Sequence, residues 1–314
     1  MAKQKLAAPL GASLIVVSSI FYASYGIWTT LMGDAFGGYM ASGIRSTIVV
    51  AVLLLIAYFA KKFEPLQIRR TWPYILGMFV TALMVWGPLY YAILHAGVGI
   101  GLTINYACIV IGMLFFGWLF SREQLTKSKL LSAALGIVGL VLIYLPSISG
   151  GIGWLALGAA AISGLGGALN MVCVKLVPYN ATQSIVVGWG TGVPANLLMA
   201  FLLGETAPAF GLDAVWMYLL IFAVTSVIAS WMFTTGLKLV DAGIAGILGL
   251  LEIVFAVLIG VVFFDEKPGP LVLAGACVII VSAAIPYVQT WGTEALKARR
   301  LKRLKRLRLA AKRA

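Results

Sequence analysis

A succession of long apolar runs constrains this chain more than any other feature of its sequence. Taking about 17 to 25 apolar residues as the length of a membrane span, we count ten such runs in the 314 residues. The runs cover residues 10–32, 39–60, 72–95, 98–120, 130–145, 153–174, 184–204, 215–237, 243–264 and 271–287. They are continuous, without the alternation of apolar and polar residues that a transmembrane β-strand shows. The sequence therefore predicts an all-α integral membrane protein with ten transmembrane helices.

The composition supports this interpretation. Hydrophobic residues make up 62% of the chain and charged residues only 11%, whereas about a quarter of a soluble protein is charged. This balance argues against a disordered chain, a disulfide scaffold and an ordinary cytosolic enzyme. The three cysteines lie in or at the end of apolar runs and are interpreted as packing residues. We find no Walker motif, and we expect neither a cofactor nor a metal site.

The basic residues predict the orientation in the membrane. If the N-terminus lies in the cytoplasm, 21 of the 23 lysines and arginines fall on the inner side, Lys267 alone falls on the outer side, and Arg45 lies inside the second span. Cytoplasmic loops of membrane proteins carry such an excess of positive charge. We therefore expect both termini in the cytoplasm and the protein in a plasma membrane, in particular a bacterial inner membrane.

The C-terminal tail, residues 291–314, is strongly basic. Ten of the basic residues lie between Lys297 and Arg313. Leu301, Leu304 and Leu307 recur every third residue among them, which is typical of a helix lying on a membrane surface. Anionic lipids of the inner leaflet are the expected partner of this tail. Nucleic acid or a regulatory protein is the less favoured alternative.

The two halves of the chain, residues 1–147 and 148–290, show an internal repeat. The matched pairs are Thr81 with Thr225 and Gly99 with Gly243 at a shift of 144 residues, then Gly117 with Gly260 and Glu123 with Glu266 one residue earlier in register. Hydropathy, loop positions and the short fifth and tenth spans agree with this alignment. Because each half has an odd number of spans, the second half enters the membrane from the opposite side. Inverted repeats of this kind are common in secondary transporters.

These features together resemble the EamA branch of the drug/metabolite transporter superfamily. Arg45 matches an arginine of its second span, Glu123 matches a glutamate of its first half, and Glu252 and Glu266 match two glutamates of its second half. Ile253 stands where the family usually has a proline, so the resemblance does not by itself imply a kink there. It implies a transporter that exports or exchanges amino acids, related metabolites or drugs.

Two ionisable residues inside the predicted spans are the first candidates for a binding site, because charges at bilayer depth are costly. Arg45 lies about 10 Å from the outer end of its helix. It is expected either to snorkel to the interface or to bind a substrate carboxylate, with Glu252 as a second possible partner. Glu252 lies about 14 Å along its helix, near the midplane. It is either a proton site and counter-charge or a structural carboxylate that joins two helices.

Four further residues are candidates for contact with the solute: Asn105, Tyr106, Tyr90 and Trp28. Asn105 suits hydrogen bonding to the solute, but a bond between helices is an equally good interpretation. The aromatic residues, with Trp189 and Trp231, suit an aromatic wall, although such side chains more often pack or anchor at the interface. Pro88 predicts a kink near Val85 in the third span.

The sequence therefore predicts a secondary transporter, not an enzyme, that moves a small organic metabolite by alternating access. The favoured substrate is an amino acid or a related solute, moved by export or exchange. Coupling of this transport to protons at Glu252 is a further expectation. Two alternatives stay open. One is a membrane-embedded enzyme acting on lipid or isoprenoid substrates, and the other is a passive channel.

Overall fold

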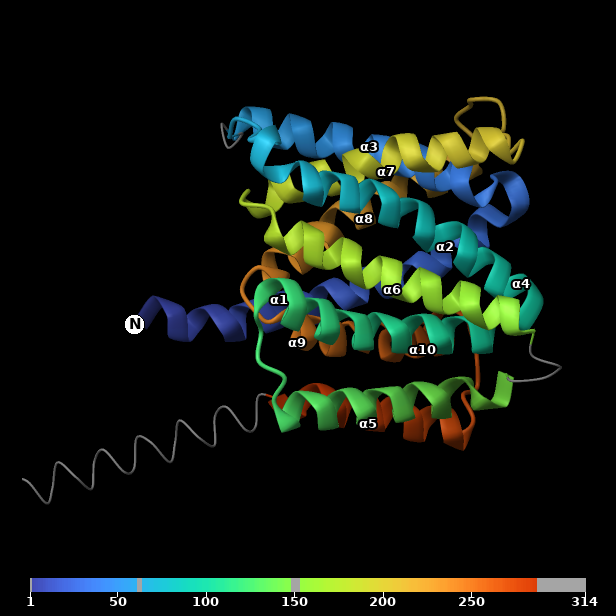
Figure 1. The fold of residues 1–314 in the computed structure, drawn as a ribbon. Coiled ribbons are helices and arrows are strands. Elements are labelled where there is room, and N and C mark those ends of the chain that lie inside the picture. The colour runs from blue at the N-terminus through green and yellow to red at the C-terminus, as the bar shows by residue number, and fades with distance from the viewer. Residues whose placement is uncertain (1, 61–63, 148–152, 287–314) are drawn as a thin grey trace, which may run out of the picture.

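The computed structural model of the chain describes residues 2–60, 64–147 and 153–286, and within these ranges all regular elements are helices. The helices are α1 Ala2–Ala23, α2 Tyr25–Met32, α3 Gly38–Phe59, α4 Ile68–Ser121, α5 Lys127–Tyr144, α6 Trp154–Leu176, α7 Ala181–Leu202, α8 Ala214–Leu237, α9 Ala242–Gly249, α10 Leu251–Phe264 and a last helix Pro270–Pro286, with short 3₁₀ turns η1 Gly33–Ala35 and η2 Leu145–Ser147. Most helices run across the molecule in roughly the same direction (Figure 1). The basic tail that was predicted to bind anionic lipid lies outside the described residues.

Eight helical segments are long and apolar enough to cross a membrane. Large apolar side chains cover the outside of the bundle, among them Trp154, Phe201 and Val262, which are 86%, 81% and 71% exposed. A soluble protein rarely exposes so much contiguous apolar surface to water. The predicted all-α membrane protein is therefore confirmed. The number of crossings stays a prediction, because α4 is one of the eight segments and Pro270–Pro286 is shorter than the others.

Helix α4 contains a sharp reversal at Gly97. Its 54 residues would extend about 81 Å if straight, far more than the hydrocarbon core of about 30 Å. Gly97 has φ 83° and ψ 158°, which interrupts the helix. Beyond it the chain folds back, so that a Cβ added to Gly101 would lie 3.2 Å from Cγ1 of Ile93. Figure 1 shows α4 crossing the molecule in cyan and returning in green.

We expect Gly97→Ala to lower the thermal unfolding midpoint of the purified protein. The backbone conformation of Gly97 is one that essentially only glycine adopts, and forcing it on another residue costs about 1–3 kcal/mol. An added Cβ would meet nothing within 4 Å, so this cost comes from the backbone alone. Gly190→Ala in α7 is the matched control, since its Cβ also meets nothing within 4 Å and its φ is not positive. Equal unfolding midpoints for Gly97→Ala and Gly190→Ala would contradict the expected backbone strain at position 97.

The ends of α4 and α10 share one geometry, at positions that the repeat alignment pairs. The residue after each helix is left-handed: Arg122 has φ 55° and Asp265 has φ 52°. The next backbone N–H then reaches back to the matched glycine, Glu123 to Gly117 O at 3.2 Å and Glu266 to Gly260 O at 3.1 Å. The two halves therefore end these helices in the same way, as expected for a repeat.

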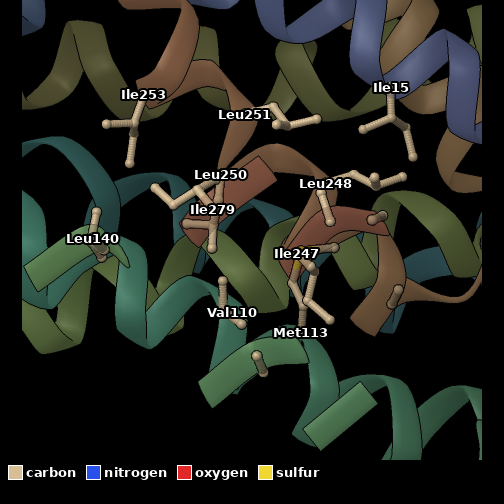
Figure 2. Packing of buried hydrophobic residues seen from close by; sticks show 14 of the residues in the cluster. Ile15, Val110, Met113, Leu140, Ile247, Leu248, Leu250, Leu251, Ile253 and Ile279 are labelled. Carbon is tan, nitrogen blue, oxygen red and sulfur yellow. The ribbon is translucent and has the colours of Figure 1, made fainter. Parts of the chain in front are cut away.

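The largest apolar core surrounds α9 and α10 (Figure 2). Ile247, Leu250 and Ile253 pack there with residues of α4, α5 and the last helix, and each is at most 3% exposed. The regular helix is interrupted at Leu250, between α9 and α10, although the family's proline is absent from position 253. This core fixes the position of Glu252 at the start of α10.

Candidate solute-binding site

A cavity of about 250 Å³ lies between helices of both halves of the chain. Residues of α1, α2, α3 and the first part of α4 line it together with residues of α6, α7 and α8. Its polar and aromatic lining residues are Tyr22, Tyr25, Ser42, Arg45, Ser46, Trp86, Asn170, Trp189, Asn196, Ser230, Phe233 and Thr234. Arg45 is the only charged side chain among the described residues that line it.

Arg45 is held in this cavity by aromatic rings. Its side chain is 3% exposed, so it does not snorkel to the membrane surface. The guanidinium carbon lies 4.1 Å from the ring centroid of Phe222, 5.2 Å from that of Tyr25, and 5.5 Å from those of both Trp86 and Trp189. Within the described part of the chain the guanidinium makes no hydrogen bond or ion pair, and its buried Nε has no partner.

Glu252 lies outside the set of residues that line the cavity. Its carboxylate accepts a hydrogen bond of 3.0 Å from the hydroxyl of Tyr106, which joins α10 to α4. In the described ranges no ion pair connects Glu252 to Arg45. Two of the predicted site residues, Glu252 and Tyr106, are therefore together, but neither is among the residues that line the cavity with Arg45.

Asn105 forms a bond between helices. It is 5% exposed, and its Nδ2 donates to Ser163 Oγ at 2.8 Å. Ser163 in turn donates to the carbonyl of Val85 at 2.7 Å, close to the proline that was expected to disturb the third span. A polar group on α6 thus satisfies a carbonyl near Pro88, which is how membrane proteins tolerate such residues.

Tyr90 and Trp28 also lie away from the cavity lining. Tyr90 is 62% exposed on the outside of the bundle. Trp28 packs with Met32, Phe222 and their neighbours, and its Nε1 donates to Ser24 Oγ at 3.3 Å. Of the six candidate residues, the structure thus places only Arg45 in the cavity wall.

Sequence reasoning did not single out Tyr25, Asn170 and Asn196 as site residues. The signal for the two asparagines is visible afterwards, because polar residues inside long apolar runs are usually buried in the bundle. Asn170 Nδ2 donates to Thr81 Oγ1 at 2.8 Å, so it joins α6 to α4. Asn196 Nδ2 donates to Gly192 O at 2.8 Å, whereas its Oδ1 is buried without a hydrogen-bond partner.

A network that we call the Glu123 latch lies beside one end of the cavity and is made of Glu123, Lys175 and the N-terminus of α9 at Ala242. Glu123 Oε1 accepts hydrogen bonds from Lys175 Nζ at 2.6 Å and from the backbone N–H of Ala242 at 2.8 Å. A carboxylate is favourable at a helix N-terminus because of the helix dipole. The latch therefore ties the ends of α4 and α6 to the start of α9.

Two further contacts reinforce the latch. Lys238, directly after α8, donates from Nζ to Val177 O at 3.0 Å, and Lys129 forms an ion pair with Asp241. Burial, with a smaller contribution from the charge of Lys175, lowers the pKa of Lys238 to about 8. Val174 and Leu237, the sequence neighbours of Lys175 and Lys238, line the cavity, so these two lysines lie beside its end.

The opposite end of the bundle lacks the matching contact. The repeat pairs Glu123 with Glu266 and Gly243 with Gly99, and both carboxylates lie against the matched glycine of their own helix. In the described ranges, however, no hydrogen bond connects Glu266 to the backbone of Val98 or Gly99. The two matched glutamates, Glu123 and Glu266, therefore make different contacts in this structure.

Comparisons with known proteins agree with the fold and the repeat. The sequence model of the EamA-like transporter family matches residues 9–145 and again 152–287. Solute carrier family 35 member G1 of Mus musculus is 22% identical over 241 residues, which are 71% of this chain and 63% of that protein. The chain thus spans less than two thirds of that relative. A solved crystal structure of a protein is 18% identical and superimposes with a TM-score of 0.71, over 92% of this chain and 98% of the other, which shows a shared fold. The chain belongs to the EamA-like transporter family.

Proposed function

We propose that the protein is a secondary transporter that moves one small organic solute at a time through the cavity around Arg45, by export or exchange across a plasma membrane. Membership of a transporter family supports movement of a solute across a membrane. The observation that carries the proposal is the cavity itself, which is built from both halves of the chain and has a buried, unpaired cation in its wall. Its volume of about 250 Å³ suits a metabolite of amino-acid size and is just below the roughly 300–1,000 Å³ of sites for drug-sized ligands.

The chain crosses the membrane ten times, as two inverted halves with both termini in the cytoplasm. The reversal at Gly97 supports two crossings within α4, and Pro270–Pro286 supplies a short final one. The shared helix ends at Glu123 and Glu266 support the repeat. In inverted repeats, one half adopts the arrangement of the other when the transporter changes its open side.

The Glu123 latch suggests how the protein alternates between its two states. By the positive-inside rule it lies at the cytoplasmic end of the cavity, whereas the matched glutamate, Glu266, makes no such contact with the described residues at the outer end. In the alternate state Glu266 would cap the helix that begins at Val98, and the Glu123 latch would be open. Alternating access follows when solute binding changes the relative stability of the state with the Glu123 contact and the state with the Glu266 contact.

Counterflow in liposomes tests the proposed function. Purified protein is reconstituted with an internal unlabelled solute, and entry of the labelled solute is followed for a panel of amino acids and organic acids, at two pH values and with or without a proton gradient. Saturable counterflow for at least one solute is expected. Flux that does not saturate and shows no exchange would favour a channel. Folded protein without flux for any solute would favour the enzyme alternative and lipid-like substrates.

Glu252→Gln is expected to abolish stimulation of transport by a proton gradient, while counterflow without a gradient continues. Glutamine can still accept the hydrogen bond from Tyr106, so the contact of α10 with α4 persists, but the amide cannot bind and release a proton. Counterflow rates with and without the gradient provide the measurement. Asp34→Asn, at an exposed position before α3, is the matched control. Undiminished stimulation in Glu252→Gln would place the coupling site elsewhere.

A further inference from the structure

The charges around the cavity are unbalanced. Arg45 supplies one positive charge, and no aspartate or glutamate is among the described lining residues. Glu252 is bonded to Tyr106 and outside the lining, so it does not compensate Arg45. Four aromatic rings offset much of the lost hydration of the Arg45 cation, but they leave its buried Nε donor without an acceptor and its charge without a counter-ion. The bound state of the transporter should therefore contain an anion at this place.

The hydrogen-bonding capacity of Arg45 points to a carboxylate. Phe222, Tyr25 and the two tryptophans hold the cation through ring faces, and such contacts use the charge of the guanidinium but not its N–H donors. The donors lie in the guanidinium plane as a fork, which fits the two oxygens of a carboxylate. The buried Nε is one of these unused donors.

The remaining wall offers no counter-charge for a positively charged group of the solute. An amino acid would bring an ammonium group into a cavity whose only charged side chain is already positive. Two unpartnered acceptors occur among the described lining residues, Asn196 Oδ1 and the hydroxyl oxygen of Tyr25. Both are neutral and therefore suit a hydroxyl or amide donor better than an uncompensated cation. Val85, Ile185 and Phe233 make much of the remaining wall apolar.

We propose that the cavity selects organic monoanions over the corresponding zwitterions, with the solute carboxylate on the guanidinium of Arg45 and an apolar body against Trp86, Trp189 and Phe233. This inference rests on the proposed function in that it assigns the substrate class of the same cavity. It narrows the substrates from amino acids and related solutes to small monocarboxylic acids without an ammonium group.

Binding of matched probes to the purified full chain in detergent tests the substrate class without requiring transport. Isothermal titration calorimetry compares 3-phenylpropionate, phenylalanine and phenethylamine, which share one body and differ in charge. The pair 4-methylpentanoate and leucine repeats the comparison with an aliphatic body. We expect each acid to bind at least about tenfold more tightly than its amino acid, because the ammonium has no counter-charge. Equal or tighter binding of the amino acids, or no binding of either acid at millimolar concentration, would overturn the inference.

Three variants assign the preference to the cavity. Arg45→Met should weaken binding of the acids at least about tenfold, whereas Arg70→Met, at an exposed position in α4, should leave it unchanged. Asn196→Asp adds a carboxylate to the wall, so the preference for acid over amino acid should fall, whether the new group attracts the ammonium or pairs with Arg45. A preference that survives both Arg45→Met and Asn196→Asp, in protein with a normal unfolding midpoint, would contradict the assignment.

The two proposals fail in different ways. Tight acid binding without counterflow of any solute would retain the monoanion site and remove the transporter. Saturable counterflow of leucine or phenylalanine, with no binding or flux of the matched acids, would retain the transporter and remove the monoanion site.

Discussion

Arg45→Met is expected to reduce counterflow at least about 100-fold while the thermal unfolding midpoint changes little. Loss of one partner from a buried, hydrogen-bonded charge pair typically costs about 2–5 kcal/mol, and about 2.7 kcal/mol corresponds to a factor of 100. The solute carboxylate would be that stranded partner in the variant. Counterflow at saturating and limiting solute concentration, together with the unfolding midpoint, provides the measurement.

The stability of the variant is informative because two contributions oppose each other. Each desolvated cation–π contact is worth about 2 kcal/mol or less, and Arg45 has four rings within 5.5 Å. Burial of the charge without a hydrogen-bonded partner costs several kcal/mol. The two contributions are similar in size, so the empty protein gains or loses little when methionine fills the same space.

A purely structural arginine would behave differently. If the aromatic contacts of Arg45 served only to hold α3 against α2, α4, α7 and α8, Arg45→Met would lower the unfolding midpoint and leave transport by the surviving folded protein intact. Arg45→Lys separates charge from geometry, because lysine keeps the charge but lacks the planar fork. Intermediate counterflow in Arg45→Lys, with normal counterflow in Arg70→Met, is the expected pattern.

The helices could be predicted because the bilayer imposes one simple rule on sequence. Runs such as residues 184–204 and 215–237 must be apolar over about 30 Å, and the structure has α7 and α8 there. Gly97 was in a predicted gap between two spans, but the sequence did not show that the chain reverses within a single residue of non-helical geometry. Such a tight turn depends on how two helices pack, which hydropathy does not encode.

The candidate site could be predicted only in part, because a sequence does not reveal how far each helix is rotated. Arg45 was identifiable from its charge at bilayer depth, and the structure places it in the cavity wall. Tyr90 and Trp28 have the same chemistry as Tyr25 and Trp86, yet only the latter two line the cavity. One residue of helix turns a side chain by about 100°, so a choice among neighbouring aromatics requires the packed bundle.

Lys175→Met is expected to open the end of the cavity beside the Glu123 latch. Lys175 and Glu123 side chains are only 15% and 8% exposed, so their ion pair is poorly screened by water. Loss of a partner from a buried pair costs about 3–5 kcal/mol, and even half of this would shift the ratio of closed to open molecules about 10- to 70-fold. The latch would then no longer hold the end of α6 against α4 and α9.

Cysteine labelling measures this shift directly. Thr234→Cys places a thiol in the cavity lining, in protein whose native residues Cys108, Cys173 and Cys277 are replaced by serine. A membrane-impermeant maleimide is applied from the side of the membrane on which the latch lies. It should label the Thr234→Cys protein slowly when the latch is intact, and at least about tenfold faster when the protein also carries Lys175→Met. Lys127→Met, an exposed lysine at the same end, is the matched control.

The repeat provides a second matched pair for the latch. Glu123→Gln removes the ion pair with Lys175 and should also accelerate labelling from the cytoplasmic side. Glu266→Gln should not, because in this state Glu266 holds no helix N-terminus among the described residues. If both glutamine variants accelerated labelling equally, or from both sides of the membrane, the change would be a general loosening of the bundle. Faster labelling in Glu123→Gln alone would identify one gate of an alternating transporter, since only the closed latch has a contact to lose.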